Sequence, residues 1–429
     1  MHGFSYKNAS LFCEDVELAT LADEHGTPLY VYSAATILDH YRRLDAALTG
    51  VEHEVAYAVK ANSNLSVLRL LANEGAGFDI VSGGELFRVI KAGGDPAHCT
   101  FAGVGKTREE IVYALEQGIY SFNVESEEEL RYLNQVAGEL GMIAPAAVRV
   151  NPNVDAHTHK YISTGKSENK FGVDFEAISG LYERAAAELP NIRLRGLQMH
   201  IGSQLTSIDP FIEAVEKVTP LVKQLKERHG IEFWSIGGGI GIIYKESLES
   251  GALDWWEDQP EQDRPLTIDR YGKELVPRLK DLGLKILLEP GRLIVGNAGV
   301  LLSRCLYEKK GAAKTFKIVD AGMNDLIRPA LYEGHHEIAP LKQPESDLRV
   351  AVDVVGPICE SGDFFCQNRE LPEIQAGDFI ALMSAGAYGF AMASNYNSRP
   401  LPAEILVEGK TATVIRKRQT QDDLIAGEL

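Results

Sequence analysis

Short runs rich in β-branched and aromatic residues alternate with amphipathic stretches between residues 54 and 290 of the chain. Eight of these runs have the length and composition that are typical of strands. The strand candidates are residues 54–59, 77–82, 99–103, 120–124, 147–151, 196–201, 233–238 and 285–290. The regular alternation predicts an α/β fold in which parallel strands are connected by helices.

The stretches between these runs have the apolar spacing of helices that bury one face. In "SVLRLLANEG" the residues Val67, Leu70 and Leu71 are expected to share a face. In "SEEELRYLNQVAGELG" Ser126 and Glu129 have the spacing of a helix capping box. Eight strands, each followed by a helix, predict a TIM-like (β/α)₈ barrel, with an open doubly wound sheet as the alternative.

The pattern changes after residue 300 to valine-rich segments that are separated by Gly, Pro and Asp turns. These segments are residues 314–322, 348–359, 376–386 and 403–416. They predict antiparallel strands, and "TPLYVYS" near the N-terminus is a further strand candidate for the same sheet. We therefore expect a barrel of residues 34–300 and a mainly antiparallel β-domain built from both chain ends, residues 1–33 and 301–429.

One long interruption, residues 245–272, follows the seventh strand candidate. Its sequence, "KESLESGALDWWEDQPEQDRPLTIDRYG", is acidic and polar and contains two adjacent tryptophans. This composition predicts a surface segment or lid and indicates no function.

The charge of the chain narrows the classes of partner. The 429 residues are 45% hydrophobic and carry a formal net charge of −18, which repels nucleic acid and anionic bilayers. The first ten residues have no basic segment followed by an apolar run, and no stretch reaches transmembrane length. We expect a cytoplasmic protein that binds neither nucleic acid nor membranes.

The five cysteines are an odd number without a CxxC spacing, so the sequence predicts neither a disulfide framework nor a zinc site. No metal site is expected.

Lys60 is the first candidate for chemistry. It directly follows a strand candidate in "AYAVKANSN", so it should lie at the C-terminal mouth of the barrel, where barrel enzymes hold their reactive groups. An amine enclosed by the barrel wall would lose its charge readily and could bond to a carbonyl carbon. Judged from position alone, a solvated lysine at a strand end is the more common outcome.

Two further motifs follow strand candidates and are expected at the same rim of the barrel. Gly237, Gly238 and Gly239 follow the seventh strand candidate, where a glycine backbone can approach an anion closely, although such a triplet is equally typical of a tight turn. In "EPGR", Glu289 and Arg292 leave the eighth candidate on a turn. A lysine, a phosphate cradle and a carboxylate on one rim match the aldehyde, phosphate and ring nitrogen of pyridoxal 5'-phosphate.

Seven motifs, "YAVKANSN", "HIGSQ", "GGGIG", "EPGR", "NDLIRPALY", "CESGD" and "GAYG", occur in this order over about 330 residues. In this the chain resembles the diaminopimelate decarboxylase family of fold-type III, alanine-racemase-like pyridoxal-phosphate enzymes. The resemblance implies decarboxylation of meso-2,6-diaminopimelate to L-lysine and CO₂, the last step of lysine biosynthesis. It also implies a barrel plus a β-domain, in a head-to-tail homodimer whose active sites are completed by the partner subunit.

The resemblance assigns roles around the cofactor. Lys60 is implied as the lysine that bonds to the cofactor, His200 as the residue packed on the ring face, and Glu289 as the acid facing the ring nitrogen. The phosphate is assigned to Ser203, Gly237, Gly238 and Gly239. Further cofactor contacts are assigned to Asp79, Gly291, Arg292 and Tyr388. Related racemases place an arginine against the ring nitrogen, so the carboxylate favours decarboxylation. Taken singly, His200 is equally typical of a buried core histidine and Ser203 of a turn cap.

Substrate recognition is assigned by the same resemblance. Arg292 and Arg328 offer two planar guanidinium groups suited to carboxylates, with Tyr332 one helical turn after Arg328. These three residues are implied to hold the carboxylate at the far end of the substrate. Glu360 is implied to bind the distal ammonium group, where ornithine-decarboxylating relatives usually carry Asp.

Two residues are implied to act across the dimer. Cys359 of the partner is the acid that returns a proton to the substrate carbon, so that Lys60, His200 and Cys359 form the catalytic set. Tyr388, in "SAGAYGFAMASNYNSRP", should reach the cofactor phosphate and the substrate across the interface, because the small residues around it suit a loop pressed against another chain.

Two alternatives remain at this level. A related decarboxylase for carboxynorspermidine, ornithine or arginine would share Lys60 and Glu289 but should lack the pairing of Arg328 with Glu360. A non-catalytic regulator with the same fold tends to lose the lysine or Cys359, and both are present.

Overall fold

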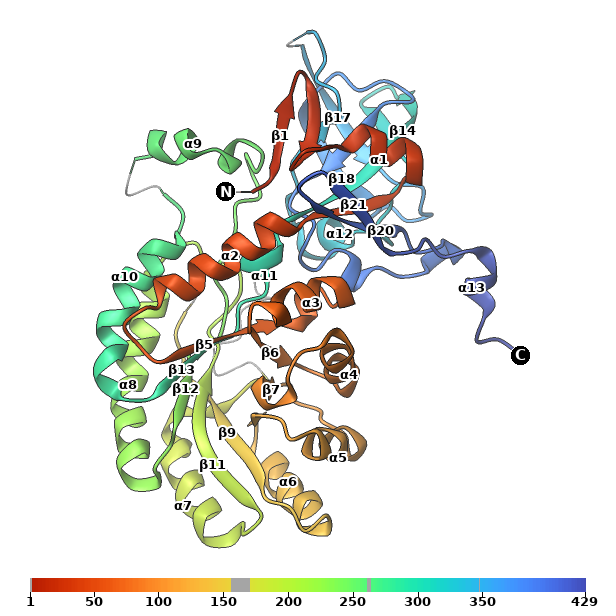
Figure 1. The fold of residues 1–429 in the computed structure, drawn as a ribbon. Helices are drawn as coiled ribbons and strands as arrows, with labels where there is room; N and C mark the ends of the chain where they lie inside the picture. The colour runs from red at the N-terminus through yellow and green to blue at the C-terminus, as the bar shows by residue number, and fades with distance from the viewer. Residues whose placement is uncertain (1, 156–169, 261–263, 347) are drawn as a thin grey trace. The chain divides into compact units, whose positions relative to one another are not determined.

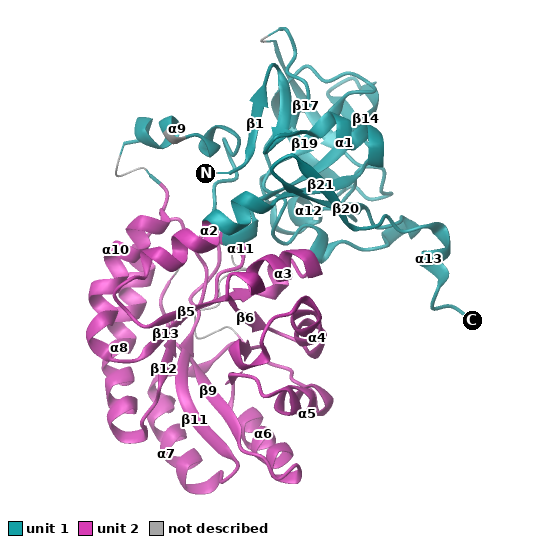
Figure 2. Ribbon diagram, in the orientation of Figure 1, with its two compact units in different colours: residues 1–39, 242–264, 294–429 teal, residues 40–241, 265–293 magenta. Residues whose placement is uncertain are grey.

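The computed structural model describes residues 2–155, 170–260, 264–346 and 348–429. The chain forms two compact units, coloured separately in Figure 2. The barrel unit contains residues 40–241 and 265–293, and the sheet unit contains residues 1–39, 242–264 and 294–429.

The barrel unit is built on eight parallel strands (Figure 1). They are β5 (His53–Ala58), β6 (Gly77–Ile80), β7 (Cys99–Phe101), β8 (Ser121–Val124), β9 (Ala144–Asn151), β11 (Ile192–Met199), β12 (Phe233–Ser235) and β13 (Lys285–Leu288). Pairing of β13 with β5 and of β8 with β9 closes the ring, which excludes the open sheet. Each strand overlaps one of the eight predicted ranges, so the predicted (β/α)₈ barrel is confirmed. The two-residue strand β10 (Val173–Asp174) pairs with β9.

Helix α2 (Ala34–Ala47) precedes the first barrel strand. The helices that follow β5 to β12 are α3 (Leu65–Asn73), α4 (Gly83–Ala92), α5 (Arg108–Gln117), α6 (Glu127–Glu139), α7 (Ile178–Glu188), α8 (Asp209–His229) and α10 (Ile268–Leu279). In α3 the buried apolar side chains are Val67, Leu68 and Leu71, so Leu68 lies on the face where Leu70 was expected. A layer of Ala147, Phe233 and Leu287 packs among the strands of the barrel.

The predicted capping box at α6 forms only in part. Ser126 accepts a hydrogen bond from the backbone N–H of Glu129, as the motif requires. The Glu129 carboxylate instead accepts from the backbone N–H of Glu125 and from the ammonium of Lys106. A buried ammonium provides a stronger partner than the N-terminal amide of the helix, because both groups are charged.

The sheet unit has a mainly antiparallel sheet in the order β18-β17-β15-β14-β4-β20-β21, with β19 paired to β14 and β16. The strands are β4 (Leu29–Ser33), β14 (Gly299–Lys310), β15 (Thr315–Val319), β16 (Ile338–Pro340), β17 (Arg349–Val355), β18 (Phe364–Pro372), β19 (Phe379–Leu382), β20 (Ala403–Glu408) and β21 (Thr411–Arg416). The N-terminal β4 lies between β14 and β20, which confirms that both chain ends build this sheet. Strands β14, β16 and β18 were not predicted.

The smaller elements of the sheet unit complete its core. They are β1 (Phe4–Lys7), β2 (Ser10–Cys13), β3 (Val16–Glu17), α1 (Leu18–His25), α9 (Leu253–Asp258), α12 (Arg328–Tyr332) and α13 (Gln421–Ile425), and the short α11 (Arg292–Val295) begins in the barrel unit. Buried side chains of β1, β2, β4, β14 and β20 form one apolar cluster, which includes Leu11, Val31, Val300 and Ile405.

The long interruption is less irregular than its composition predicts. Residues 245–260 contain a 3₁₀ turn, Glu249–Gly251, and helix α9. Residues 268–272 begin helix α10, whose Tyr271 is fully buried with its ring 5.1 Å from that of Phe211. The prediction of a surface segment is therefore wrong for this end, and residues 261–263 lie outside the described part of the chain.

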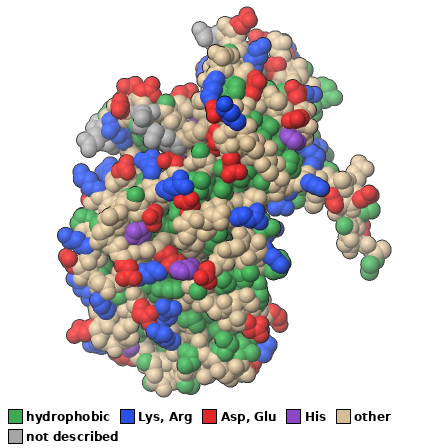
Figure 3. Space-filling model, in the orientation of Figure 1, with side chains coloured by type: hydrophobic (Ala, Val, Ile, Leu, Met, Phe, Trp, Pro, Cys, Tyr) green, Lys and Arg blue, Asp and Glu red, His purple; other side chains and the backbone are tan. Residues whose placement is uncertain are grey.

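Lys and Arg side chains are interspersed with Asp and Glu side chains on the face in Figure 3. The exposed pairs include Arg131 and Arg184 with Glu127, which contribute little to stability because solvent screens them. A bilayer-spanning helix is not found anywhere in the described ranges.

Candidate active site

Four of the seven motifs meet at the C-terminal ends of adjacent barrel strands. The backbone N–H of Ala58, two residues before Lys60, donates to the Pro290 carbonyl oxygen at 2.9 Å. The backbone N–H of Glu289 donates to the Gly237 carbonyl oxygen, also at 2.9 Å. The backbone N–H of Gly238 donates to Nδ1 of His200 at 3.3 Å. The barrel closure therefore brings "YAVKANSN", "EPGR", "GGGIG" and "HIGSQ" together, as expected for a site at this rim.

Lys60 lies in a 3₁₀ turn, Val59–Ala61, that starts where β5 ends. Its ammonium Nζ lies 3.1 Å from Oδ2 of Asp79, which belongs to the neighbouring strand β6. The side chain of Lys60 is 43% exposed and that of Asp79 is 1% exposed. The partly exposed amine is therefore paired with a buried carboxylate and is not enclosed by the barrel wall.

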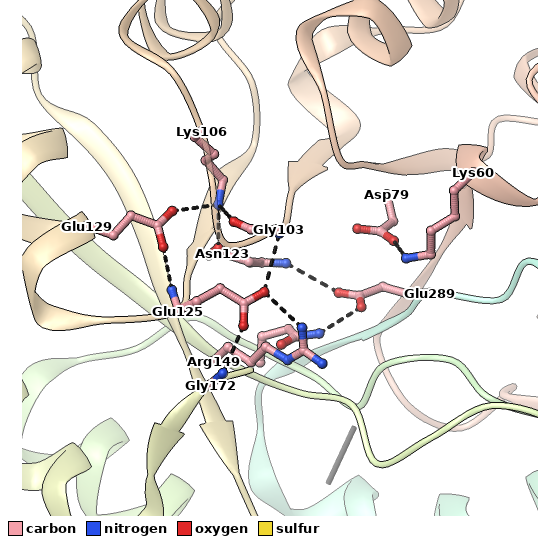
Figure 4. A network of polar contacts seen from close by, with 11 residues as sticks. Lys60, Asp79, Gly103, Lys106, Asn123, Glu125, Glu129, Arg149, Gly172 and Glu289 are labelled. Atoms are coloured by element: carbon pink, nitrogen blue, oxygen red, sulfur yellow. Dashed lines mark hydrogen bonds and ion pairs between the residues drawn. The ribbon is translucent and has the colours of Figure 1, made fainter. Parts of the chain in front are cut away.

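Glu289 follows β13 and is buried. Its carboxylate accepts hydrogen bonds from Ser235 Oγ at 2.6 Å and Gln198 Nε2 at 2.8 Å. It also accepts from Asn123 Nδ2 at 3.4 Å (Figure 4). Burial, and next the negative charge of Asp79, raise the pKa of Glu289 to about 7, against the lowering effect of its hydrogen bonds. All three donors that it meets among the described residues are neutral.

His200 follows β11 directly. Desolvation, and the positive charges of Arg149 and Lys60, hold the pKa of His200 well below its usual value. The ring is therefore neutral at physiological pH, with Nδ1 as the acceptor from Gly238. A neutral imidazole fixed in this way can pack against a flat aromatic ring without bringing a second cation to the site.

Contacts and backbone conformation within this chain explain why positions 237–239 are glycines. Gly237 and Gly239 have φ values of +74° and +109°, which side chains rarely adopt. A Cβ at Gly238 would overlap the carbonyl oxygen of Glu289. The N–H groups of Gly237 and Gly238 contact Ser235 Oγ and His200 Nδ1, both at 3.3 Å. The close approach predicted from the triplet exists, and it is to this chain's own backbone.

Arg292 and Ser203 come from two different motifs and meet. The Nη2 atom of Arg292 donates to Oγ of Ser203 at 3.1 Å, and Arg292 is buried. A Cβ at Gly291 would lie 3.0 Å from the Cβ of Ala61, so the "EPGR" turn packs directly against the segment that carries Lys60.

A buried ionic network beside Glu289 was not predicted (Figure 4). The Lys106 ammonium, 2% exposed, donates to the carbonyl oxygens of Gly103 and Asn123 and to Glu129. Glu125 accepts from Arg149 at 2.8 Å and from the backbone N–H of Gly172 at 2.9 Å. The network ties together the C-terminal ends of β7, β8 and β9.

Sequence reasoning also missed Asn123, Gln198 and Ser235, which orient Glu289. Each is a polar residue at a buried position of a barrel strand. A polar side chain in an otherwise apolar parallel strand needs a partner, and that signal could have marked all three.

Arg328 opens α12 in the sheet unit and is buried. Its guanidinium carbon lies 4.4 Å from the centre of the Tyr244 ring, and its Nη1 lies 2.7 Å from Nε2 of His336. Tyr332 ends the same helix and is half-buried.

Cys359 and Glu360 lie on an exposed turn of the sheet unit. The backbone N–H of Cys359 donates to the Asn397 side chain at 3.1 Å. Glu360 accepts from the Tyr396 hydroxyl at 2.5 Å, and this hydrogen bond and the charge of Glu360 raise the pKa of Tyr396. The turn that carries the two candidates is thus anchored to residues 396–397.

Tyr388 has a φ of +56°, a conformation that is strained for a residue with a side chain. Gly386 is buried, and a Cβ there would overlap the Val295 carbonyl oxygen. Ala385 and Ala387 are fully buried as well. The small residues therefore fit a tight passage within the sheet unit, and their expected contact with another chain stays a prediction.

The barrel residues fit pyridoxal phosphate on two observations. Oδ1 of Asp79 is buried and meets no hydrogen-bond donor in the part of the chain that the structure describes. Glu289 is a buried carboxylate with neutral donors and a raised pKa, a setting in which a cationic ring nitrogen would be favourable. The amine of Lys60 lies beside the first of these acids.

Comparison with known proteins identifies the class. Residues 34–296 match the family model described as pyridoxal-dependent decarboxylase, pyridoxal binding domain. The chain therefore belongs to the pyridoxal-dependent decarboxylases.

The similarity extends over the whole chain. The chain is 50% identical to the diaminopimelate decarboxylase of Pseudomonas aeruginosa, over 100% of this chain and 99% of that protein. The structure of diaminopimelate decarboxylase from Helicobacter pylori complexed with L-lysine is 41% identical, with a TM-score of 0.87 over 96% of this chain and 98% of that one. The enzyme from M. jannaschii in co-complex with L-lysine is 39% identical, with a TM-score of 0.89 over 100% and 99%. Within the class, the chain belongs to the diaminopimelate decarboxylase family.

Proposed function

We propose that the protein removes carbon dioxide from meso-2,6-diaminopimelate and releases L-lysine, the last step of lysine biosynthesis. The observation that carries the proposal is that one barrel rim holds both the Lys60 amine, which lies beside Asp79, and the buried carboxylate of Glu289, whose hydrogen-bond donors are neutral. Pyridoxal phosphate supplies an electron-withdrawing ring that accepts the electron pair left when carbon dioxide departs.

The barrel residues hold that cofactor in the proposal. Lys60 would attach to its aldehyde carbon with loss of water, and neutral His200 would pack on its ring. Glu289 would accept a hydrogen bond from the ring nitrogen and favour its protonated, charged form. A carboxylate favours this charge more than the arginine of related racemases would. Glycine backbone, Ser203 and Arg292 receive the phosphate, and Asp79 and Gly291 complete the cofactor contacts.

The sheet unit supplies most of the substrate contacts in the proposal, and the barrel unit supplies Arg292. Arg328 pairs with the carboxylate that is retained in the product, together with Arg292 and Tyr332, and Glu360 pairs with the distal ammonium group. Arg328 is buried against Tyr244 and His336, so its guanidinium is ordered in advance. Substrates that lack the far carboxylate, such as ornithine, leave this group unused.

We also propose that two chains form a head-to-tail homodimer, in the cytoplasm, in which Cys359 and Tyr388 of one chain serve the barrel site of the other. The exposed thiol of Cys359 would return a proton to the substrate carbon. The strained conformation of Tyr388 supports a functional position for its hydroxyl, since such strain concentrates at functional sites.

The experiment is an assay of carbon dioxide release by the cofactor-saturated protein. Meso-diaminopimelate, L-lysine, ornithine and arginine are supplied separately, and the amino acid product is separated by chiral chromatography. We expect release from meso-diaminopimelate only, with L-lysine as the product. Release from ornithine or arginine without release from diaminopimelate would overturn the substrate assignment.

A further inference from the structure

We infer that His336 is a positioning residue that fixes the direction in which Arg328 presents its guanidinium to the far carboxylate of the substrate. The inference rests on the proposed function, in which Arg328 recognises that carboxylate. His336 lies in "EGHHEI", a stretch that none of the sequence motifs marked.

One ring nitrogen of His336 faces a hydrogen-bond acceptor, and the other faces a hydrogen-bond donor. Nδ1 lies 2.8 Å from the backbone carbonyl oxygen of Met383, which can only accept, so Nδ1 carries the proton. Nε2 lies 2.7 Å from Nη1 of Arg328, which can only donate, so Nε2 offers its lone pair. The contacts thus assign a neutral imidazole in a single tautomer, which accepts a charge-assisted hydrogen bond from Arg328.

The His336 ring is itself held firmly. The side chain is fully buried, and the Tyr244 ring meets it edge-on with 5.4 Å between the ring centres. Arg369, on β18, donates to the His336 carbonyl oxygen at 2.5 Å. The next residue, Glu337, accepts a backbone hydrogen bond from Met383 at 2.9 Å. The imidazole is therefore part of the rigid frame of the sheet unit.

Arg328 is consequently restrained in two directions. Tyr244 covers one face of the guanidinium at 4.4 Å, and His336 takes up the donor at Nη1. A guanidinium that is hydrogen-bonded at one nitrogen and covered on one face by an aromatic ring cannot rotate out of its plane. Recognition of a carboxylate by such a group avoids most of the ordering that a free arginine side chain would require.

The inference predicts a difference between two small substitutions. In His336→Asn the shorter amide can still donate to the Met383 carbonyl oxygen but no longer reaches Arg328. In His336→Gln the longer amide can place its oxygen where Nε2 stands. His335→Asn is the matched control, because His335 contacts Arg369 through Nδ1 at 3.2 Å and is the adjacent residue in the same turn.

The decisive readout is equilibrium binding, measured by calorimetry on cofactor-saturated protein. L-lysine retains the carboxylate assigned to Arg328, and cadaverine is the same molecule without a carboxylate. We expect His336→Asn to weaken L-lysine binding about ten-fold and to leave cadaverine binding within about two-fold. His336→Gln and His335→Asn should keep the preference for L-lysine within about three-fold of the unsubstituted protein.

Equal weakening of both ligands in His336→Asn, or the same loss of preference in His335→Asn, would assign His336 a general packing role and overturn the inference. Circular dichroism monitors folding of each variant. If His336→Asn does not fold, His336→Gln decides, because a ten-fold loss of preference in that variant contradicts the inference.

Steady-state kinetics separates the inference from the proposed function. With meso-diaminopimelate, His336→Asn should raise KM about ten-fold and change kcat by less than about three-fold, because the far carboxylate is not at the reacting carbon. If the unsubstituted protein has no activity on diaminopimelate, the proposed function is wrong. If the unsubstituted protein is active and His336→Asn has the same KM and the same preference for L-lysine, only the inference is wrong.

Discussion

The Nζ atom of Lys60 lies 3.1 Å from Oδ2 of Asp79, across the neighbouring strands β5 and β6. The lysine is the exposed partner and the aspartate the buried one. The negative charge of Asp79 also raises the pKa of Glu289, so the three side chains form one electrostatic unit. Substitution of any one of the three should change the electrostatic environment of the other two.

The first prediction concerns pH and the cofactor-free protein. The pKa of Glu289 is raised from 4.5 to about 7 in the folded chain. The folded state therefore binds more protons than the unfolded state between these two pH values, and stability falls as pH rises through this window. The free energy of unfolding of the unsubstituted protein should fall by about 3 kcal/mol between pH 4.5 and 7, and Glu289→Gln should not show this fall. Urea unfolding at each pH measures both.

Exposed Glu116 on α5 provides the matched control, since Glu116→Gln should leave the pH dependence unchanged. Saturation with pyridoxal phosphate should also flatten the pH dependence of the unsubstituted protein, because a charged ring nitrogen would favour ionised Glu289. An identical pH dependence in Glu289→Gln and the unsubstituted protein would contradict the raised pKa.

The second prediction concerns the glycine triplet. Gly238→Ala places a Cβ against the backbone carbonyl of Glu289, and backbone cannot move aside cheaply. We expect a loss of about 3 kcal/mol in the free energy of unfolding and weaker cofactor retention, measured by chemical unfolding and by absorbance after dialysis. Gly105→Ala is the control, because no atom lies near its Cβ. Equal stability of the two variants would refute the explanation.

The third prediction concerns Glu360, which is exposed and accepts from Tyr396. Glu360→Gln removes the charge assigned to the distal ammonium group. The KM for meso-diaminopimelate should rise about ten-fold while the unfolding midpoint stays unchanged, since the side chain is at the surface. Glu370→Gln, at an exposed position of β18, should change neither quantity. An unaltered KM in Glu360→Gln would remove this residue from the substrate site.

The fourth prediction concerns shared sites in the proposed dimer. Lys60→Ala and Cys359→Ala subunits should each be nearly inactive alone. Random mixing after dissociation should restore about one quarter of full activity, since half of the dimers are mixed and each has one intact site. Mass spectrometry of the intact dimers verifies the mixing. Verified mixed dimers without recovered activity would contradict the composite site.

The barrel could be predicted from sequence because each strand and helix has its own periodic pattern, as "EVAYAV" and β5 illustrate. Strand β14 was not predicted because its twelve residues change from apolar to charged halfway, and neither half shows a complete strand pattern. The short β1 and β2 carry too few residues for alternation to be recognised.

The motif residues could be singled out from sequence, but the partners of their side chains could not. Ser235 and Gln198 are polar residues in apolar strands and so require partners, but they contact Glu289 only because the barrel closes, and the sequence does not identify Glu289 as that partner. The contact of Arg328 with Tyr244 likewise joins distant segments through tertiary packing. A pattern within a short window cannot contain such contacts.

The most direct measurement of the central claim is borohydride reduction of the cofactor-saturated protein, followed by peptide mapping. We predict a single stable pyridoxyl adduct on the peptide that contains Lys60. In Lys60→Ala this adduct should be lost and activity should fall by about three orders of magnitude or more. An adduct on a different lysine, or full activity in Lys60→Ala, would contradict the central claim.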